Sequence, residues 1–93
     1  MGEFGKRIKT LRRKRGLTVR ALADALGKTA GYLSRVEARD EVPAPELICI
    51  IANTLKEKPE VLLELAKRDL MQRAERQIEM KNTEALSLYR RSR

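Results

Sequence analysis

The sequence has no histidine, no tryptophan and a single cysteine, Cys49, among its 93 residues. Zinc sites and disulfide frameworks need several cysteine or histidine side chains, and a Cys/His nucleophile pair needs one of each. One copy of the chain can build none of these sites, so we expect no enzymatic activity and no bound metal or cofactor. Cys49 stands in an apolar stretch, and free cysteine behaves as a small apolar side chain. We therefore expect it to be buried.

Long apolar runs are also missing. No run approaches the roughly 18 residues of a membrane span, and the N-terminus lacks the uncharged apolar stretch of a secretory signal. We expect a cytoplasmic protein without a membrane segment. A chain of 93 residues suffices for one small domain and one further element. With 42% hydrophobic but only 3% aromatic residues, its core must be aliphatic, which is typical of packed helices.

Positive charge is concentrated at the N-terminal end of the chain. Residues 1–35 contain ten basic and two acidic side chains, a net charge of +8. Residues 36–66 carry a net charge of −4, and residues 67–93 carry +4. Lys and Arg bind phosphates and release their counterions, so a concentrated cationic surface favours nucleic acid as the partner. A basic face that is merely solvated is the alternative.

Apolar residues recur at helical spacing in five successive stretches, and nothing in the sequence resembles a strand. Thr18 and Thr29 are suited to cap the second and third helices, because a threonine hydroxyl accepts hydrogen bonds from free backbone N–H groups. Pro45 and Pro59 suit the first turn of the fourth and fifth helices, where the missing N–H is no loss. The sequence therefore predicts an all-α, five-helix bundle, with helices near residues 4–15, 18–27, 29–38, 45–55 and 59–66.

Residues 67–93 follow the domain predicted for residues 1–66. Spacings of three and four, as in a coiled-coil seam, separate Met71, Ala74, Ile78, Lys81, Ala85 and Leu88. The seam contains a lysine, and the pair Asn82-Thr83 could end one helix and cap another. We expect an additional C-terminal helix. It either packs on its own domain or frays, or else binds a second copy of the chain or a protein partner.

The second and third predicted helices have the spacing of a helix-turn-helix unit, whose second helix fits the major groove of DNA. Counting from Val19, the fifth residue is Ala23, which is small where the two helices touch. The ninth is Gly27, at a turn that favours a positive φ. The fifteenth and eighteenth, Leu33 and Val36, are apolar and face the core. Four such positions in register, after a basic first helix, predict a DNA-binding unit.

The sequence resembles the DNA-binding domains of the phage lambda-repressor and Cro type, the Xre family, over about residues 4–66. The matching segments are Phe4-Gly5-Lys6-Arg7-Ile8, Leu11-Arg12, Gly16-Leu17-Thr18, Ala21-Leu22-Ala23, Leu26-Gly27, Tyr32-Leu33-Ser34-Arg35-Val36-Glu37 and, more loosely, Pro43-Ala44-Pro45-Glu46. The resemblance implies a five-helix bundle that binds double-stranded operator DNA as a homodimer and regulates transcription. It also implies that Arg12 pairs with Glu37 as a structural brace between the first helix and the recognition helix, residues 29–38.

The recognition-helix residues not needed for packing are the candidates for DNA contact. We expect base contacts from Ala30, Gly31, Ser34 and Arg35, with Arg35 as a bidentate reader of guanine. We expect phosphate contacts from Thr18, Arg20, Lys28, Thr29, Tyr32 and Arg39, and from basic residues of the first helix. Family members often carry larger polar residues where this chain has Val19, Ala30 and Gly31, so the set of donors is reduced.

Two questions stay open at the level of sequence. The regulator could repress by occluding polymerase, or activate through acidic residues such as Glu41, Glu46 and Glu57. The bundle could also be a scaffold whose basic tail captures a protein partner, as in an antitoxin or an adaptor. An interfacial helix on anionic lipid is disfavoured, because acidic residues interrupt the cationic face of the tail.

Overall fold

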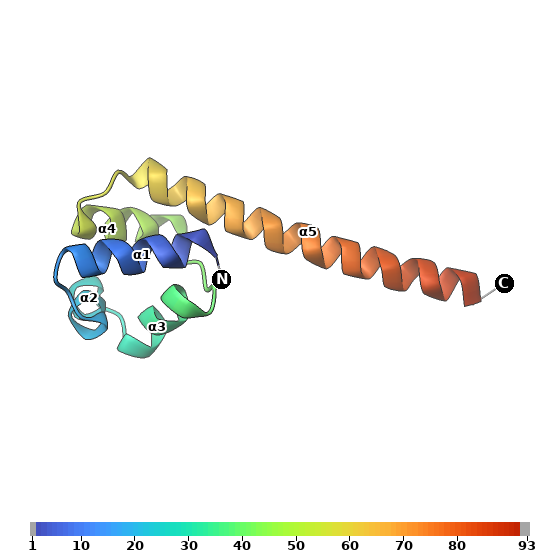
Figure 1. Ribbon diagram of the computed structural model, residues 1–93, viewed down its shortest axis with the longest axis horizontal. Helices are drawn as coiled ribbons and strands as arrows, with labels where there is room; N and C mark the ends of the chain where they lie inside the picture. The colour runs from blue at the N-terminus through green and yellow to red at the C-terminus, as the bar shows by residue number, and fades with distance from the viewer. Residues whose placement is uncertain (1, 92–93) are drawn as a thin grey trace.

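The computed structural model describes residues 2–91, which form five helices and no strand (Figure 1). Met1 of the predicted domain and residues 92–93 of the predicted extension lie outside this range. The helices are α1 (Glu3–Lys14), α2 (Val19–Leu26), α3 (Ala30–Ala38), α4 (Pro45–Leu55) and α5 (Pro59–Arg91). The prediction of an all-α, five-helix fold is therefore confirmed.

Local capping interactions set the boundaries of the short helices. Thr18 Oγ1 accepts a hydrogen bond from the Ala21 N–H at 3.0 Å, and Thr29 Oγ1 accepts one from the Tyr32 N–H at 3.1 Å. Gly27 ends α2 in the left-handed conformation, with φ of 68°. Both N-caps and this C-cap were predicted from the sequence. They hold α2 and α3 to eight and nine residues, respectively.

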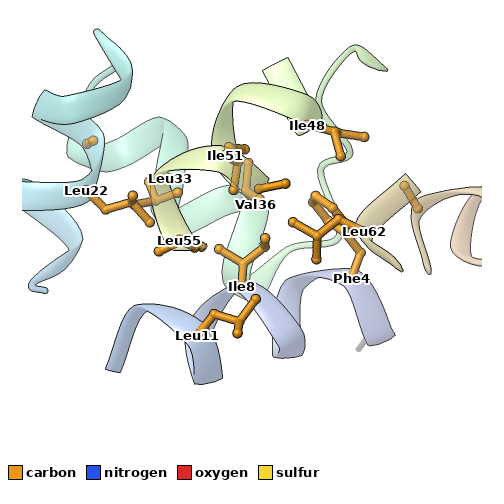
Figure 2. Packing of buried hydrophobic residues seen from close by; sticks show 13 residues of the cluster. Phe4, Ile8, Leu11, Leu22, Leu33, Val36, Ile48, Ile51, Leu55 and Leu62 are labelled. Carbon is orange, nitrogen blue, oxygen red and sulfur yellow. The ribbon is translucent and has the colours of Figure 1, made fainter. Parts of the chain in front are cut away.

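The core lies where α1, α2, α3, α4 and the first turns of α5 meet, and Figure 2 shows its side chains. It is aliphatic apart from one phenylalanine, as the composition predicts. The largest fully buried side chains are Phe4, Ile8, Leu22, Leu33, Val36, Ile48, Ile51, Leu55 and Leu62. Full burial of one such side chain contributes about 1.5–3 kcal/mol. The inner faces of α2 and α3 are therefore fixed in this core.

Helix α5 differs most from the prediction. Its 33 residues run without a break through Pro59–Arg91, so the predicted fifth helix and the additional C-terminal helix form one element. Asn82-Thr83 does not interrupt it, and the Thr83 hydroxyl donates to the Glu79 carbonyl oxygen at 3.0 Å. The distal part of α5 projects from the bundle, which gives a molecule of 60 × 25 × 20 Å (Figure 1). Within residues 2–91, no helix combines the length and the apolar character needed to cross a membrane.

A buried carboxylate joins α5 to α1. Asp69 is only 6% exposed, and its oxygens accept hydrogen bonds from the N–H groups of Glu3 at 3.1 Å and Phe4 at 3.0 Å. Asp69 thus satisfies the free N-terminal donors of α1, although it lies 66 residues from Glu3 in the sequence. A Cβ at Gly2 would collide with this carboxylate, so the missing side chain permits the contact. These hydrogen bonds therefore hold α5 against the N-terminus of α1.

The expectation that Cys49 is buried is wrong. Helix α4 carries apolar residues on most of its faces, so its periodicity does not identify the buried one. The structure turns Ile48 and Ile51 inward and leaves Cys49 and Ile50 exposed.

Candidate nucleic-acid interface

Helix α2, the turn at Gly27 and α3 form a compact pair of short helices. Ala23 is fully buried where the helices meet, so a larger side chain there would force them apart. Gly27 has a positive φ, which residues with a side chain rarely adopt. Leu33 and Val36 bury the inner face of α3. The steric reasons that the sequence offered for these positions are therefore confirmed.

The opposite face of α3 is open to solvent. Gly31, Ser34 and Arg35 are exposed, whereas Ala30 and Tyr32 are half-buried. Figure 1 shows α3 at an edge of the molecule, on the side away from α5. Three of the four residues predicted to contact bases therefore lie on one accessible helix surface, and Ala30 lies at its margin.

The residues predicted to contact phosphates surround this surface. Thr18 and Thr29 stand at the N-termini of α2 and α3, where their hydroxyl oxygens already accept the capping hydrogen bonds. Arg20 is exposed in the first turn of α2, Lys28 is exposed in the turn, and Arg39 is exposed at the end of α3. Since these bonds use only the hydroxyl oxygens as acceptors, the O–H groups of both threonines remain free to donate to an anion, together with backbone N–H groups and nearby cations.

Tyr32 lies between two cations on the outer side of α3. The Lys28 Nζ atom is 5.6 Å from the centroid of the Tyr32 ring, and the Arg35 Cζ atom is 5.7 Å from it. Arg35 Nε also donates to Glu41 Oε1 at 3.3 Å. Burial raises the pKa of the Tyr32 phenol above its usual value, Glu41 raises it further, and Arg35 lowers it. The phenol therefore stays protonated at neutral pH and can donate a hydrogen bond to a phosphate.

Arg12 and Glu37 are in direct contact. Arg12 Nε donates to Glu37 Oε2 at 2.8 Å, and Arg12 Nη2 donates to Oε1 at 3.1 Å. Arg12 Nη1 donates to the Leu17 carbonyl oxygen at 2.8 Å. The side chains of Arg12 and Glu37 are only 9% and 6% exposed. The bidentate pair connects α1 to α3, and the third hydrogen bond holds the loop before α2.

The structure adds basic residues of α1 that were not named individually from the sequence. Lys6, Lys9 and Arg13 line a groove of about 560 Å³ between α1 and α3, which Ser34 also lines. Their spacing of three and four residues places them on one helix face, and this regularity is a signal in the sequence that could have identified them. Gly5 permits the close packing beside the groove, because a Cβ there would lie 2.6 Å from the Val36 carbonyl oxygen.

Other parts of the surface are less suited to a charged ligand. Among residues 2–91, no group of three or more cysteine, aspartate or glutamate side chains could hold a metal ion. An apolar hollow of about 260 Å³ lies between the α3–α4 loop and α5, and Val42, Leu63, Leu70 and Met71 contribute to its lining. Its apolar lining suits a hydrophobic side chain of a partner rather than a nucleotide.

The comparisons with known proteins agree with this geometry. The family described as a helix-turn-helix domain matches residues 3–66. The crystal structure of SinR, a master regulator for biofilm formation solved in complex with DNA, is similar with a TM-score of 0.59 and 28% identity, covering 64% of this chain and 97% of that one. ClgR, the clp gene regulator from Corynebacterium glutamicum, is similar with a TM-score of 0.61 and 27% identity, covering 83% of each chain. No curated protein matches the chain. More than half of the sequence matches the family model, and the chain therefore belongs to the helix-turn-helix domain family, as its resemblance to Xre-type regulators predicts.

Proposed function

We propose that the protein is a sequence-specific DNA-binding regulator of transcription that inserts α3 into the major groove. The observation that carries the proposal is the exposed outer face of α3, with Arg35 on it, exposed Lys28 before the helix and exposed Arg39 after it, and a groove beside Ser34 that Lys6, Lys9 and Arg13 line. Arg35 reads guanine through N7 and O6, the commonest specific contact of arginine in the major groove. Ser34 assists, Ala30 contacts a thymine methyl group, and Gly31 allows the helix backbone to approach the bases.

Phosphate contacts fix the position of the protein on the duplex. Backbone N–H groups at the starts of α2 and α3, near Thr18 and Thr29, face one strand. Side chains from around the unit complete the contacts: Arg20, Lys28, Tyr32 and Arg39, together with Lys6, Lys9 and Arg13 of the α1 groove. This charge supports binding to any sequence, whereas Arg35 adds discrimination.

Residues 1–66 form the DNA-binding part, and residues 67–93 join two copies into a homodimer. The apolar hollow beside α5 continues onto its exposed side chains, of which Met71 is 52% and Ile78 is 59% exposed. Met71 and Ile78 are seven residues apart and lie on one face of α5. A second copy of α5 fits against this apolar face, because pairing buries the face on both chains. The two recognition helices then contact half-sites about 34 Å apart, one turn of DNA. We propose that it represses by occluding polymerase, because occlusion requires only DNA binding at a site that overlaps the one polymerase uses.

Binding to duplexes selected from a random pool tests the proposal. We expect an enriched sequence with twofold symmetry. Arg35→Ala should relax the preference at one base-pair position by about 1–3 kcal/mol, because one bidentate contact is lost. Lys28→Ala is the matched control, and it should weaken binding to every sequence alike. Competition titrations with single-base variants of the selected duplex measure both effects.

Two results would contradict the proposal. One is the absence of any enriched sequence. The other is an equal loss of affinity for all duplexes in the Arg35→Ala protein, since a residue that contacts only phosphate behaves in this way.

A further inference from the structure

Arg35 is held in place from two sides before any DNA is present. Its guanidinium lies over the Tyr32 ring, 5.7 Å from the centroid, and its Nε donates to Glu41 Oε1 at 3.3 Å. Its Nη1 lies 3.9 Å from the position that a Cβ on Gly31 would take, so the side chain runs back along α3 towards the preceding turn. The ring, the carboxylate and the helix surface together define the orientation of the guanidinium.

The backbone after α3 brings Glu41 to this position. Asp40 adopts a left-handed conformation with φ of 58°, which turns the chain back towards the helix. The N–H groups of Arg39 and Glu41 both donate to the Arg35 carbonyl oxygen, at 2.8 and 3.3 Å. The carboxylate of Glu41 is therefore presented to Arg35 by main-chain geometry as well as by its own charge.

The Arg35–Glu41 ion pair adds little to stability. The two side chains are 49% and 40% exposed, and exposed pairs of this kind are weak because water and salt screen them. The pair also places a negative charge on the surface that is to meet DNA phosphates, which opposes binding. A residue that neither stabilises the fold nor attracts DNA at this position fits a role in selectivity.

We infer that Glu41 is a positioning and specificity-determining residue that acts through Arg35. The inference deepens the proposed function and rests on it. Glu41 engages Nε and leaves the two terminal nitrogens of the guanidinium to donate to N7 and O6 of guanine. On a duplex without that guanine, an Arg35 side chain that turns to a phosphate leaves Glu41, and the carboxylate then faces the DNA without a partner. Glu41 therefore penalises non-specific complexes more than the specific one.

Gly31 also affects the position of the Arg35 guanidinium. Apart from the Arg35 Nη1 and Thr29 Oγ1 atoms, each 3.9 Å away, a Cβ at this position meets only open space. The missing side chain leaves the end of the guanidinium uncovered on the side of the preceding turn. This gives a physical reason for a glycine inside a recognition helix, where it lowers helix propensity.

The test compares Glu41→Gln and Glu41→Ala with Glu60→Gln, which removes the same charge at the start of α5, on the far side of the bundle from α3 (Figure 1). Each protein is titrated at two salt concentrations against three duplexes: the sequence selected by the wild type, its variant at the base pair read by Arg35, and a scrambled duplex. We expect both Glu41 variants to bind the scrambled duplex more tightly. The ratio of specific to non-specific affinity should fall by about 1.5-fold to fivefold, the range of an exposed charge pair. Glu60→Gln should leave the ratio unchanged.

The possible failures are distinguishable. Wild-type specificity combined with equal ratios for the Glu41 and Glu60 variants overturns the role of Glu41 and leaves the proposed function intact. A wild-type protein that binds all three duplexes alike overturns the proposed function, and the role of Glu41 with it. A loss of helical circular dichroism in the Glu41 variants would show that the residue supports the fold instead, which also overturns the inference.

Discussion

At the scale of single residues, the nearly buried Arg12–Glu37 pair connects α1 to the recognition helix. Arg12 uses Nε, Nη1 and Nη2 as donors to Glu37 and to the Leu17 carbonyl oxygen while it is nearly buried. A buried charge without a partner is costly, so each member of the pair depends on the other. The contact lies between α1 and the recognition helix, and the position of α3 on the bundle therefore depends on it.

Arg12→Ala should lower the free energy of unfolding by about 3 kcal/mol or more, because it leaves the Glu37 carboxylate buried without its partner. The double variant with Glu37→Ala should lose less than the sum of the two single losses. Arg13→Ala, at the neighbouring exposed position, should change stability by only about 0.5 kcal/mol. Urea unfolding compares the wild type with Arg12→Ala, Glu37→Ala, the double variant and Arg13→Ala. Additive losses would show that the two residues act independently.

Tyr32 reports on its neighbours through its titration. In a Tyr89→Phe background, Tyr32 is the only tyrosine, and the absorbance of its phenolate should appear at a pH above the usual pKa of about 10. The raised pKa means that folding favours the protonated phenol. This contribution to stability is complete below about pH 10 and is lost as the pH rises through the pKa of the folded protein.

Glu41→Gln should lower the Tyr32 pKa, since it removes one of the causes that raise it, while burial still acts. Glu60→Gln serves again as the control and should leave the titration unchanged. An identical titration in the Glu41→Gln protein and its parent would show that the carboxylate does not lie beside Tyr32 in solution.

At the scale of helices, the contact between α5 and α1 sets the orientation of the projecting helix. Asp69 caps α1 from a distant part of the sequence, and Gly2 leaves room for its carboxylate. A carboxylate at a helix N-terminus also interacts favourably with the helix dipole. The first turn of α1 and the first third of α5 are therefore stabilised together.

Asp69→Ala should destabilise the protein by about 1–2 kcal/mol, because two backbone donors of α1 lose their acceptor. Asp69→Asn should cost less, since the amide keeps one acceptor oxygen. Glu75→Ala removes an exposed carboxylate from the same helix and should have little effect on stability. Chemical denaturation compares the three variants. Equal stability of Asp69→Ala and Glu75→Ala would mean that the cap contributes nothing.

At the scale of the whole molecule, a compact bundle carries a long helix whose distal part projects away from the bundle (Figure 1). Side chains from Leu70 onward are mostly exposed, and they include Met71, Ile78 and Met80. Isolated helices are marginal in water, because most helical stability comes from packing of an apolar face. A second chain along α5 would supply this packing.

Truncation after Leu70 should convert a dimer to a monomer and weaken operator binding roughly a hundredfold, because the second half-site is no longer linked to the first. Within the full chain, Ile78→Glu should dissociate the dimer, and Thr83→Glu, on another face of α5, should not. Sedimentation equilibrium and operator titrations measure the two properties. If both survive truncation, the part of α5 beyond Leu70 does not form the dimer, and an adaptor role for the tail becomes the better hypothesis.

Local signals predicted much of this architecture. The caps at Thr18 and Thr29, the left-handed Gly27 and the small Ala23 act within a few residues of themselves, so the sequence was sufficient to place α2 and α3. The pairing of Arg12 with Glu37 was an implication of family resemblance rather than of spacing. Apolar periodicity did not identify the buried residues of α4, because apolar side chains occur around most of that helix, and Cys49 is exposed.

The sequence by itself determined the helix-turn-helix unit, the helical fold and the basic N-terminal region, because each depends on interactions between residues close together in the chain. Only the tertiary structure decided that α5 is continuous, that Asp69 caps α1, and that Glu41 meets Arg35. These contacts depend on the angles at which the helices cross and on the path of the turn after α3. Crossing angles follow from the packing of the whole core, and although Glu41 lies only six residues from Arg35, no residue pattern in that stretch signals the left-handed turn at Asp40 that brings the two together.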